Sequence, residues 1–438
     1  MLALTVATVA FVTLGCKVNQ VDSDTMRTHL IGKGFRCVDP TDSPDVIVIN
    51  SCAVTAESER KTRQKLRHFR TRYPKCIMVL TGCAVQIEPG AAGIYPEADI
   101  ILSHQETNNL ASYIAKYAIH HNKPLEAHVL CCDEFFDRND SSRESASRTR
   151  AYLKIEDGCN QFCSYCIIPH ARGRVRSKPL DVIRKEVKTL VDQGFQEVVL
   201  VGINLAAYGL DLDCGLSDVI ILFVEFTEIK RLRLGSLEPL CLTEGILETL
   251  SRVKSFCPHF HISLQSGCDG VLKRMNRHYT AAEYFSLAKR VRTFFPDCAI
   301  TTDIIVGFPG ESDDDFEASL AFVRKIGFAK VHVFPFSARK GTPAASFPGQ
   351  IEKARKQARA KQLISLADEL NCIFLSGQQG KTLEVLLEQP HPTGGMQGYT
   401  ANYAHVIVMD AVPGQRNQIL PVRISEINHE LCIGNLSC

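Results

Sequence analysis

The sequence predicts an α/β protein of three parts: an open parallel sheet, an incomplete barrel of strand–helix units, and a small β-barrel at the carboxyl end. Three observations lead to this prediction. Short apolar runs alternate with helical patterns over the first 120 residues, the alternation restarts at Ala151, and from about Gly377 short β-like runs are broken by Gly and Pro. Of the 438 residues, 45% are hydrophobic and 22% are charged, which excludes a wholly disordered or collagen-like chain.

The first part begins with Val6–Leu14, a continuous apolar run that is typical of a strand buried on both faces. No Lys or Arg precedes this run and no cleavage site follows it, so we interpret it as a strand of a cytoplasmic protein rather than as a signal peptide. No apolar run reaches the roughly 18 residues of a transmembrane helix, so no membrane partner is expected. The elements that follow are a helix at Asp22–Lys33, a strand at Val46–Asn50, a basic helix at Glu57–Arg72, strands at Ile77–Thr81 and Ala98–Leu102, and a helix that ends near His120.

A polar stretch rich in Ser and Arg, Asp133–Arg150, is the expected linker. The barrel strands are expected at Tyr152–Glu156, Glu197–Val201, Arg231–Leu234, His259–Leu264, Ala299–Ile305 and Lys330–Phe334. Six strand–helix units in about 190 residues predict an incomplete TIM-like barrel, because a complete one usually needs about 250. A basic helix over Glu352–Asn371 and the β-like runs Thr382–Leu387, Ala404–Val408 and Ile419–Ile424 complete the chain. The expected domains are residues 1–132, 151–375 and 376–438, with the linker at 133–150.

The strongest chemical signal is a set of three cysteines, Cys159, Cys163 and Cys166, in a loop directly after the first barrel strand. The chain has 18 cysteines, and thiols that cluster in a reducing compartment indicate metal binding or catalysis. This spacing lets one loop bind three irons of a 4Fe–4S cluster and leaves the fourth iron open for a small molecule. A zinc site and ordinary core cysteines are the alternatives, although a structural zinc site needs a fourth ligand.

The segment Asp157–Ser177, which reads DGCNQFCSYCIIPHARGRVRS, resembles the methylthiotransferase family of the radical S-adenosylmethionine superfamily. The resemblance implies that the open iron binds the amino and carboxylate groups of S-adenosylmethionine. It also implies that the reduced cluster cleaves this cofactor to a 5′-deoxyadenosyl radical. The resemblance covers essentially the whole chain, and it implies that the terminal barrel is of the TRAM type.

Cys16, Cys52 and Cys83 form a second set, because each is the second residue after a predicted parallel strand. Ligands bind at the carboxyl ends of strands in an open α/β sheet, so these thiols should converge, although spacing alone leaves scattered structural thiols as the alternative. The segments LGCKVNQ, NSCAVT and TGCAVQ around them resemble the amino-terminal domain of the same family. The resemblance implies an auxiliary 4Fe–4S cluster here, so the expected cofactors are two 4Fe–4S clusters and S-adenosylmethionine.

The carboxyl ends of the other barrel strands supply the candidate contacts to S-adenosylmethionine, because barrel active sites gather at these ends. The motifs GSLEP, SLQSGCDGVLKRMNR and TTDIIVGFPGE resemble family motifs. The candidate cofactor-binding residues are Tyr165, Ser236, Glu238, Gln265 and Asp303. Each of them could instead cap a helix or satisfy a turn. Asn204 is another polar residue at these strand ends, Cys268 is expected to be structural, and no residue is expected to act as a nucleophile.

Three basic segments predict contacts with phosphate groups, although a charged helix face is often only solvated. The net charge is +2, so any nucleic-acid surface must be local. Residues 60–75 carry eight Lys or Arg and no acid, residues 353–361 carry five more, and Arg172, Arg174, Arg176 and Lys178 follow the barrel cysteines. From Ser376 onward the chain has three basic and five acidic residues. The terminal barrel should therefore contact RNA through Tyr399 and Tyr403, or RNA should bind to the other segments instead.

The predicted function is tRNA modification at N6-threonylcarbamoyladenosine 3′ of the anticodon, where a methylthio group replaces the hydrogen on C2. Lys17 in LGCKVNQ and the segment ARGRVRS resemble the subgroup with this activity. Arg339 is the candidate partner for the carboxylate of the threonylcarbamoyl group, and the anticodon stem-loop and a flavodoxin or ferredoxin are the expected partners. The alternatives are methylthiolation of isopentenyladenosine in tRNA or of a ribosomal-protein aspartate, and a non-catalytic iron–sulfur protein that binds RNA. The sequence does not indicate the sulfur donor.

Overall fold

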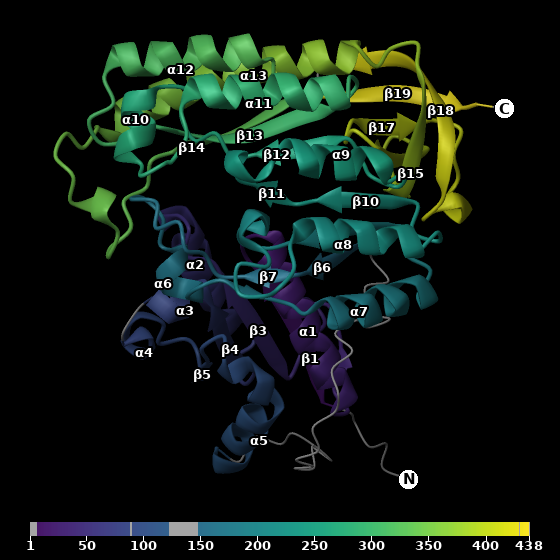
Figure 1. The fold of residues 1–438 in the computed structure, drawn as a ribbon. Helices are drawn as coiled ribbons and strands as arrows, with labels where there is room; N and C mark the ends of the chain where they lie inside the picture. The colour runs from purple at the N-terminus through teal and green to yellow at the C-terminus, as the bar shows by residue number, and fades with distance from the viewer. Residues whose placement is uncertain (1–6, 88–89, 122–147, 429, 438) are drawn as a thin grey trace.

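The computed structural model describes residues 7–87, 90–121, 148–428 and 430–437. Figure 1 shows the amino-terminal sheet in purple and blue below a larger array of parallel strands and helices in teal and green. The terminal barrel, in yellow, lies at one end of that array. No helix in these ranges is both long enough and apolar enough to span a membrane.

The amino-terminal sheet is open and entirely parallel, as predicted, with strand order β2-β1-β3-β4-β5. Its strands are β1 (Thr8–Thr13), β2 (Arg36–Cys37), β3 (Val46–Ser51), β4 (Ile77–Gly82) and β5 (Ile100–Ile101), and its helices are α1 (Lys17–Gly32), α2 (Ala56–Arg72), α3 (Cys83–Ile87), α4 (Ala91–Ile94) and α5 (Leu110–His120). Alternate residues of the central strands pack into two separate cores, one on each face, which explains why these strands are continuous apolar runs.

Two differences from the prediction have local causes. Strand β2 was not predicted, because a two-residue edge strand carries too little pattern. Helix α1 begins at Lys17, five residues before the predicted Asp22, and the residue before it, Cys16, makes no side-chain capping bond. The first turn is instead fixed by tertiary contacts, since the Asn19 amide donates to the Ser51 carbonyl over 2.9 Å.

The second array is an incomplete barrel of parallel strands, as predicted. One sheet has the order β10-β9-β6 and the other β11-β12-β13-β14, and an isolated parallel bridge links Leu232 of β10 to Phe256, three residues before β12. In the described ranges β6 and β14 do not pair, so the barrel is open between these two strands. The strands are β6 (Arg150–Lys154), β9 (Glu197–Val201), β10 (Arg231–Leu234), β11 (Ser236–Leu237), β12 (His259–Ile262), β13 (Ala299–Val306) and β14 (Lys330–Pro335).

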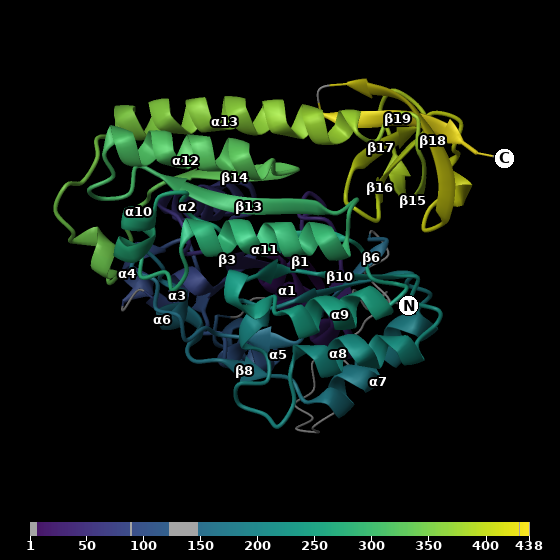
Figure 2. The same ribbon diagram turned by 45° about the horizontal axis from the view of Figure 1, so that its top comes forward.

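Helices cover the outer face of this barrel (Figure 2). They are α7 (Leu180–Asp192), α8 (Leu216–Leu222), α9 (Glu244–Arg252), α10 (Asp269–Arg274), α11 (Ala281–Phe294), α12 (Asp313–Ile326) and α13 (Lys353–Ser376). Most of the expected linker, Asp133–Arg150, lies outside the described residues, and its last residue, Arg150, is the first residue of β6. The short antiparallel pair β7 (Glu156–Asp157) and β8 (Arg176–Ser177), with α6 (Ile168–Arg172) between them, frames the loop after β6.

The terminal part is a closed barrel with order β15-β16-β17-β19-β18, as predicted. Its strands are β15 (Thr382–Pro390), β16 (Met396–Thr400), β17 (His405–Val408), β18 (Ile419–Asn428) and β19 (Leu431–Leu436). It packs against the amino-terminal ends of the parallel strands, where Arg231 donates to the carbonyls of Tyr399 and Glu384 over 2.8 and 2.7 Å. Figures 1 and 2 both show it at the opposite end from α3 and α6, so the carboxyl ends of the parallel strands stay clear of it.

Candidate active site

The amino-terminal triad, Cys16, Cys52 and Cys83, lies at the carboxyl ends of β1, β3 and β4. Its turns require glycine: Gly15 and Gly82 have φ values of +119° and +99°, and a Cβ at Gly82 would lie 2.4 Å from the Ser51 carbonyl oxygen. The pKa of the Cys83 thiol is raised to about 11, mainly by burial and in smaller part by the nearby thiols of Cys52 and Cys16, against the opposing effect of Arg172. The fold therefore brings together the three thiols that the sequence selected.

The barrel triad, Cys159, Cys163 and Cys166, lies in the loop between β7 and α6. Gly158 starts this loop with φ +88°, and a Cβ there would lie 2.0 Å from the Arg174 carbonyl oxygen. Burial raises the pKa of Cys166 to about 12, and the neighbouring thiols Cys163 and Cys159 raise it as well. These three thiols are also neighbours.

The two triads lie beside each other through one small apolar cluster. Ala53, Cys83 and Ala84 of the amino-terminal part pack against Ile167 and Ala171 of the barrel loop. Ala53 follows Cys52 and Ile167 follows Cys166, so the contact joins the two cysteine loops directly.

Zinc and an iron–sulfur cluster place different demands on the spacing of the thiols. Zinc–sulfur bonds of about 2.3 Å in a tetrahedron place the sulfurs about 3.8 Å apart. Among the described residues, the group whose ligand atoms all lie within 4.8 Å is His261, Asp303 and His332, and neither cysteine triad meets this limit. A 4Fe–4S cluster, in which each thiolate binds a different iron, does not require the three sulfurs to approach one another this closely.

Unsatisfied polar atoms lie next to the barrel triad. The Asn204 amide nitrogen is 3.9 Å from the Cys159 sulfur, and the Asn204 oxygen is buried without a hydrogen-bond partner. One carboxyl oxygen of Glu156 is also buried and unpartnered, and burial raises the pKa of this group to about 8. Buried polar atoms are rarely left unpaired, so they fit a polar group bound at this end of the barrel.

Arg277 is a site residue that no sequence pattern singled out. It is buried, and it donates to the Cys163 sulfur over 3.3 Å and to the Glu238 carboxylate over 2.5 Å. Its cation therefore offsets negative charge on a thiolate and fixes Glu238, one of the predicted cofactor contacts. Arg277 ends the quoted motif SLQSGCDGVLKRMNR, so the signal was present in the sequence, but its position beside Cys163 was not.

The other predicted cofactor contacts divide into two groups. Ser236, whose hydroxyl lies 3.2 Å from that of Ser263, and half-buried Tyr165 lie at the same end as the barrel triad. Gln265 adopts φ +69°, and its backbone N–H donates to the Asp303 carbonyl over 2.8 Å, so its backbone extends the parallel pairing with β13. The Asp303 side chain points instead into the barrel lumen.

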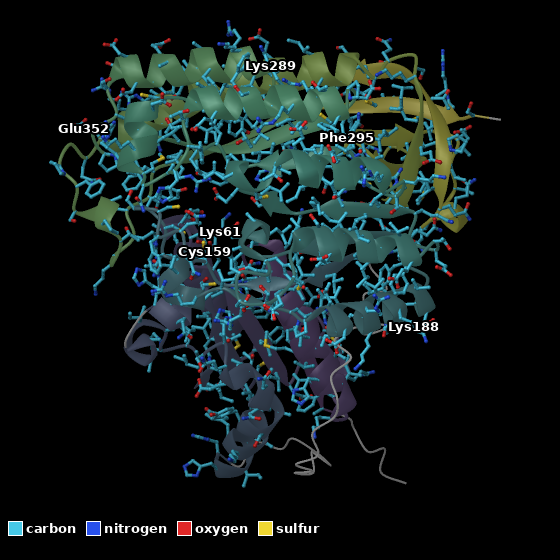
Figure 3. The ribbon with its side chains drawn as sticks, viewed as in Figure 1. Lys61, Cys159, Lys188, Lys289, Phe295 and Glu352 are labelled. Carbon is cyan, nitrogen blue, oxygen red and sulfur yellow. The ribbon has the colours of Figure 1, made fainter. Side chains whose placement is uncertain are left out.

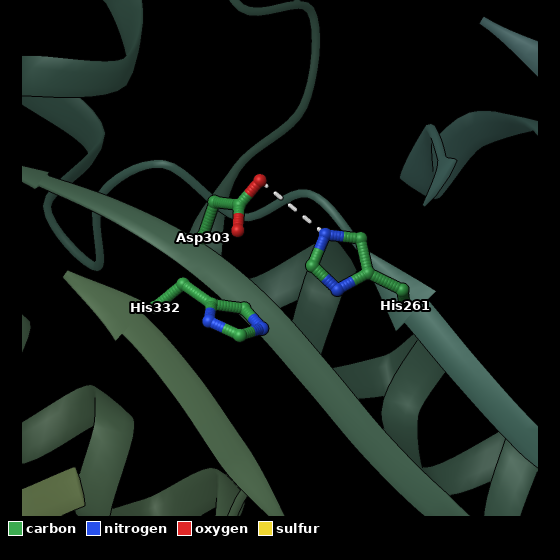
Figure 4. A group of neighbouring side chains, drawn as sticks. All are labelled: His261, Asp303 and His332. Atoms are coloured by element: carbon green, nitrogen blue, oxygen red, sulfur yellow. Dashed lines mark hydrogen bonds and ion pairs between the residues drawn. The ribbon is translucent and has the colours of Figure 1, made fainter. Parts of the chain in front are cut away.

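In the lumen, Asp303 meets His261 and His332 from the two adjacent strands (Figure 4). The His261 Nε2 atom lies 3.3 Å from the Asp303 carboxylate, and its Nδ1 atom lies 3.0 Å from the Thr301 hydroxyl. Burial lowers the pKa of His332, while Asp303 opposes that effect. These polar side chains line the interior of the barrel below the cysteine loop.

A buried ion-pair network joins the amino-terminal sheet to the barrel loop. Arg172 donates to Asp22 over 2.8 Å, to Asp157 over 3.1 Å and to the Asn19 amide oxygen over 3.0 Å, and Lys154 donates to Asp22 over 2.5 Å. Arg172 is only 5% exposed, so the expectation that it contacts phosphate is wrong: polar groups of the protein already surround it. Arg174 and Arg176 remain exposed.

The basic residues of α2 and α13 also fall into two groups, those paired with an acid and those without an ion pair. In α2, Arg70 pairs with Asp99 at 2.6 Å and Arg67 with Glu97 at 3.0 Å, whereas Lys61, Arg63 and Lys65 have no ion pair with a described residue. In α13, Arg359 is buried against Glu311 at 2.6 Å and Arg355 pairs with Asp313, which ties this helix to the turn after β13. These paired arginines hold the fold together, and only the unpaired cations are available for phosphate.

The expectation for Arg339, and the first of the two alternatives for the terminal barrel, were wrong for the same reason. Arg339 is buried and forms an ion pair with Glu59, so it is not available for a substrate carboxylate. Tyr399 and Tyr403 lie under the guanidinium of Arg150, at 4.9 and 5.3 Å from their ring centroids, and Tyr403 also lies under Arg233. Both tyrosines therefore form the contact with the large barrel and do not offer open faces to RNA.

Comparison with known proteins adds two family models and several relatives. Residues 153–323 match the radical SAM superfamily, and residues 8–103 match the uncharacterized protein family UPF0004. The chain is 35% identical over 436 residues to the threonylcarbamoyladenosine tRNA methylthiotransferase MtaB of Thermotoga maritima, which covers 98% of this chain and 96% of that protein. It is 35% identical to the protein of the same name from Bacillus subtilis, over 92% and 90% of the two chains.

More distant likenesses agree with the fold. A tRNA-2-methylthio-N(6)-dimethylallyladenosine synthase of Clostridium botulinum is 32% identical, over 86% of this chain and 85% of that protein. Among solved structures, the radical S-adenosylmethionine methyltransferase TsrM from Kitasatospora setae, with cobalamin and a [4Fe-4S] cluster bound, superposes with a TM-score of 0.56. It covers 78% of this chain and 77% of its own at 14% identity, so it supports the fold alone.

Proposed function

Since this chain belongs to the family of radical S-adenosylmethionine methylthiotransferases that act on threonylcarbamoyladenosine in tRNA, we propose that its two cysteine triads form one active site for this reaction. The enzyme replaces the C2 hydrogen of the modified adenosine 3′ of the anticodon with a methylthio group. The observation that carries the proposal is the apolar contact between the two cysteine loops, which brings both triads to one substrate.

The cofactors follow from the donor sets. S-adenosylmethionine and iron–sulfur chemistry come with the family, and we assign one 4Fe–4S cluster to Cys159, Cys163 and Cys166 and a second to Cys16, Cys52 and Cys83. When bound, the first cluster supplies the electron that cleaves S-adenosylmethionine to a 5′-deoxyadenosyl radical, and the second supplies a site for the sulfur to be transferred. The C2–H bond is not activated for polar chemistry, so no side chain is needed as a nucleophile.

The side chains around the barrel triad prepare this end for a charged cofactor. Arg277 offsets negative charge at Cys163 and orients Glu238, and a pKa of about 8 keeps Glu156 mostly protonated at neutral pH. The Glu156 carboxyl group therefore adds no negative charge beside Cys159. Ser236, Glu238 and Tyr165, with Asn204, are the residues that we assign to S-adenosylmethionine.

The tRNA surface that we propose consists of cations near the two triads, of which four have no ion pair with a described residue and the fifth, Arg176, lies 3.9 Å from Asp157. Lys61, Arg63 and Lys65 lie on α2, and Arg174 and Arg176 lie beside the barrel triad. Such cations bind phosphate without reading sequence, so they position the anticodon stem. The proposed electron donor is a flavodoxin or a ferredoxin. We propose that the TRAM-like terminal barrel stabilises the large barrel through the contact between them.

Iron analysis tests the cluster assignment. The anaerobically reconstituted chain should hold about eight irons, and replacing either triad by Ala should remove about half of them. A matched triple variant at Cys214, Cys241 and Cys298, which lie outside both triads, should keep its iron. Full iron content in the Cys16, Cys52 and Cys83 variant would refute the second cluster.

Mass spectrometry of tRNA nucleosides tests the substrate. Enzyme with both clusters should convert threonylcarbamoyladenosine to its 2-methylthio derivative, and the variant that lacks the amino-terminal triad should form 5′-deoxyadenosine without a methylthio product. Isopentenyladenosine is the second candidate, because a dimethylallyladenosine synthase is 32% identical to this chain. Methylthiolation of that nucleoside alone would assign the chain to the other subgroup.

A further inference from the structure

Lys17 is a half-buried cation that the proposed chemistry does not yet use. It is the first residue of α1 and follows Cys16 of the amino-terminal triad. Its ammonium lies over the ring of Tyr152, 6.0 Å from the centroid, and makes no hydrogen bond or ion pair with any residue that the structure describes. A charge withdrawn from water is costly unless it is paired, so this position calls for an anionic ligand.

The ammonium lies in the lumen of the incomplete barrel. Tyr152 faces the lumen, because its neighbours Ala151 and Leu153 belong to the core under the helices. On the other side of the opening, burial lowers the pKa of His332 on β14, and the Lys17 charge lowers it further. Lys17 acts in the same direction on His259 of β12. The side chain therefore enters the barrel between its two unpaired edge strands, β6 and β14.

The other charged groups of the lumen are already paired. Arg233 donates to Glu197 over 3.0 Å, Arg150 lies 2.7 Å from Glu388, and Asp303 lies 3.3 Å from His261. Outside the lumen, Glu59 already neutralises Arg339, the cation that the sequence suggested for the substrate carboxylate. Lys17 forms no ion pair in the described part of the lumen, where its charged neighbours are Arg150, Arg233 and Glu197.

We propose that Lys17 binds the carboxylate of the threonylcarbamoyl group and so selects the modified adenosine, an inference that rests on the proposed function. This substituent carries one carboxylate and one hydroxyl group. The ammonium supplies the charge for the first, and His332, beside Asp303, supplies a hydrogen-bonding group for the second. Lys17 follows Cys16 directly in the chain, and we propose that the sulfur is delivered from the triad to which Cys16 belongs.

Binding of three anticodon stem-loops to the anaerobically reconstituted full chain tests this inference. They carry threonylcarbamoyladenosine, its neutral methyl ester, or adenosine at the modified position, and fluorescence anisotropy gives each Kd. The wild-type chain should bind the acid about 10- to 100-fold more tightly than the ester, as for a hydrogen bond to a charged group. In Lys17→Met the ratio of the two Kd values should fall to about 1, whereas Lys17→Arg should retain most of it.

Lys188→Met is the matched control, because Lys188 lies on α7, away from Cys159 (Figure 3), and should keep the wild-type ratio. Lys17→Gln repeats the test if Lys17→Met loses iron. An unchanged acid-to-ester ratio in the Lys17 variants would overturn the inference, as would loss of 5′-deoxyadenosine formation without tRNA, which would assign the ammonium to the cofactor. Methylthiolation by the wild-type enzyme is measured separately, so failure of the proposed function is distinguishable from failure of the Lys17 assignment.

Discussion

Replacing Asp22 by Asn should weaken the junction between the amino-terminal sheet and the barrel loop. Burial opposes ionisation of Asp22, but Lys154 and Arg172 outweigh it and lower the pKa from 3.8 to about 2. A shift of one pKa unit corresponds to about 1.4 kcal/mol, so the ionised Asp22 stabilises the folded chain by about 2 kcal/mol at neutral pH. Asp22→Asn should lose at least this amount, because Arg172 and Lys154 then keep only Asp157 as an acidic partner.

The pH dependence of the stability difference between wild type and Asp22→Asn is a second, independent test. The pKa of Asp22 is lower in the folded than in the unfolded chain, so its contribution is full above pH 3.8 and is lost as the pH falls through about 2. The difference in stability between wild type and Asp22→Asn should therefore be constant from pH 7 to about 5. It should be roughly halved at pH 3.

Urea unfolding followed by far-UV circular dichroism measures both quantities, since the chain contains no Trp for fluorescence. Asp213→Asn is the matched control, because Asp213 has no ion pair with a described residue, and this variant should unfold like the wild type. A loss below about 0.5 kcal/mol for Asp22→Asn, or a loss that does not shrink at pH 3, would refute the argument that this network holds the two cysteine loops together.

Three further predictions follow from the same contacts. Arg70→Met should lower the free energy of unfolding by about 3 kcal/mol, because the ion pair with Asp99 and the hydrogen bonds to the Glu97 and Cys76 carbonyls are lost together. Arg63→Met should cost less than about 0.5 kcal/mol, and equal losses would contradict the division of α2 into paired and free cations. Gly158→Ala should remove about half of the bound iron, because the new Cβ would lie 2.0 Å from the Arg174 carbonyl oxygen. Gly173→Ala, whose Cβ would meet only a flexible side chain at 3.3 Å, should keep more iron. Similar iron contents in the two variants would show that the loop tolerates the change. Reversing the charges of Lys61, Arg63 and Lys65 to Glu should raise the Kd for tRNA and reduce the slope of its salt dependence by roughly one for each phosphate that is no longer neutralised. Unaltered tRNA binding would remove α2 from the proposed surface, and Lys185 and Lys188 on α7, changed to Glu, are the control.

The strands and the cysteine ligand candidates could be predicted from the sequence because their signals are local. A strand buried on both faces is a continuous apolar run, so Val46–Ser51 and Ile77–Gly82 were located to within one residue. A cysteine two residues after such a strand necessarily lies at the carboxyl edge of the sheet. The closed terminal barrel was also predicted, but β16 and β19 were missed, because short strands interrupted by Gly resemble loops.

The partners of the charged residues were decided only by the tertiary structure. Arg172, Arg70, Arg339 and Arg359 all belong to segments that look like phosphate-binding or substrate-binding surfaces, yet each is paired with an acid. Arg172 and Asp22 are 150 residues apart in the chain, and Arg339 and Glu59 are 280 apart, so no local pattern can indicate these pairs. The converse holds for Lys17, which looks like an ordinary first-turn lysine until the fold places it in the barrel lumen without an acid. The electrostatic role of a side chain depends on which distant segment lies opposite it, and the sequence determines that only through the complete fold.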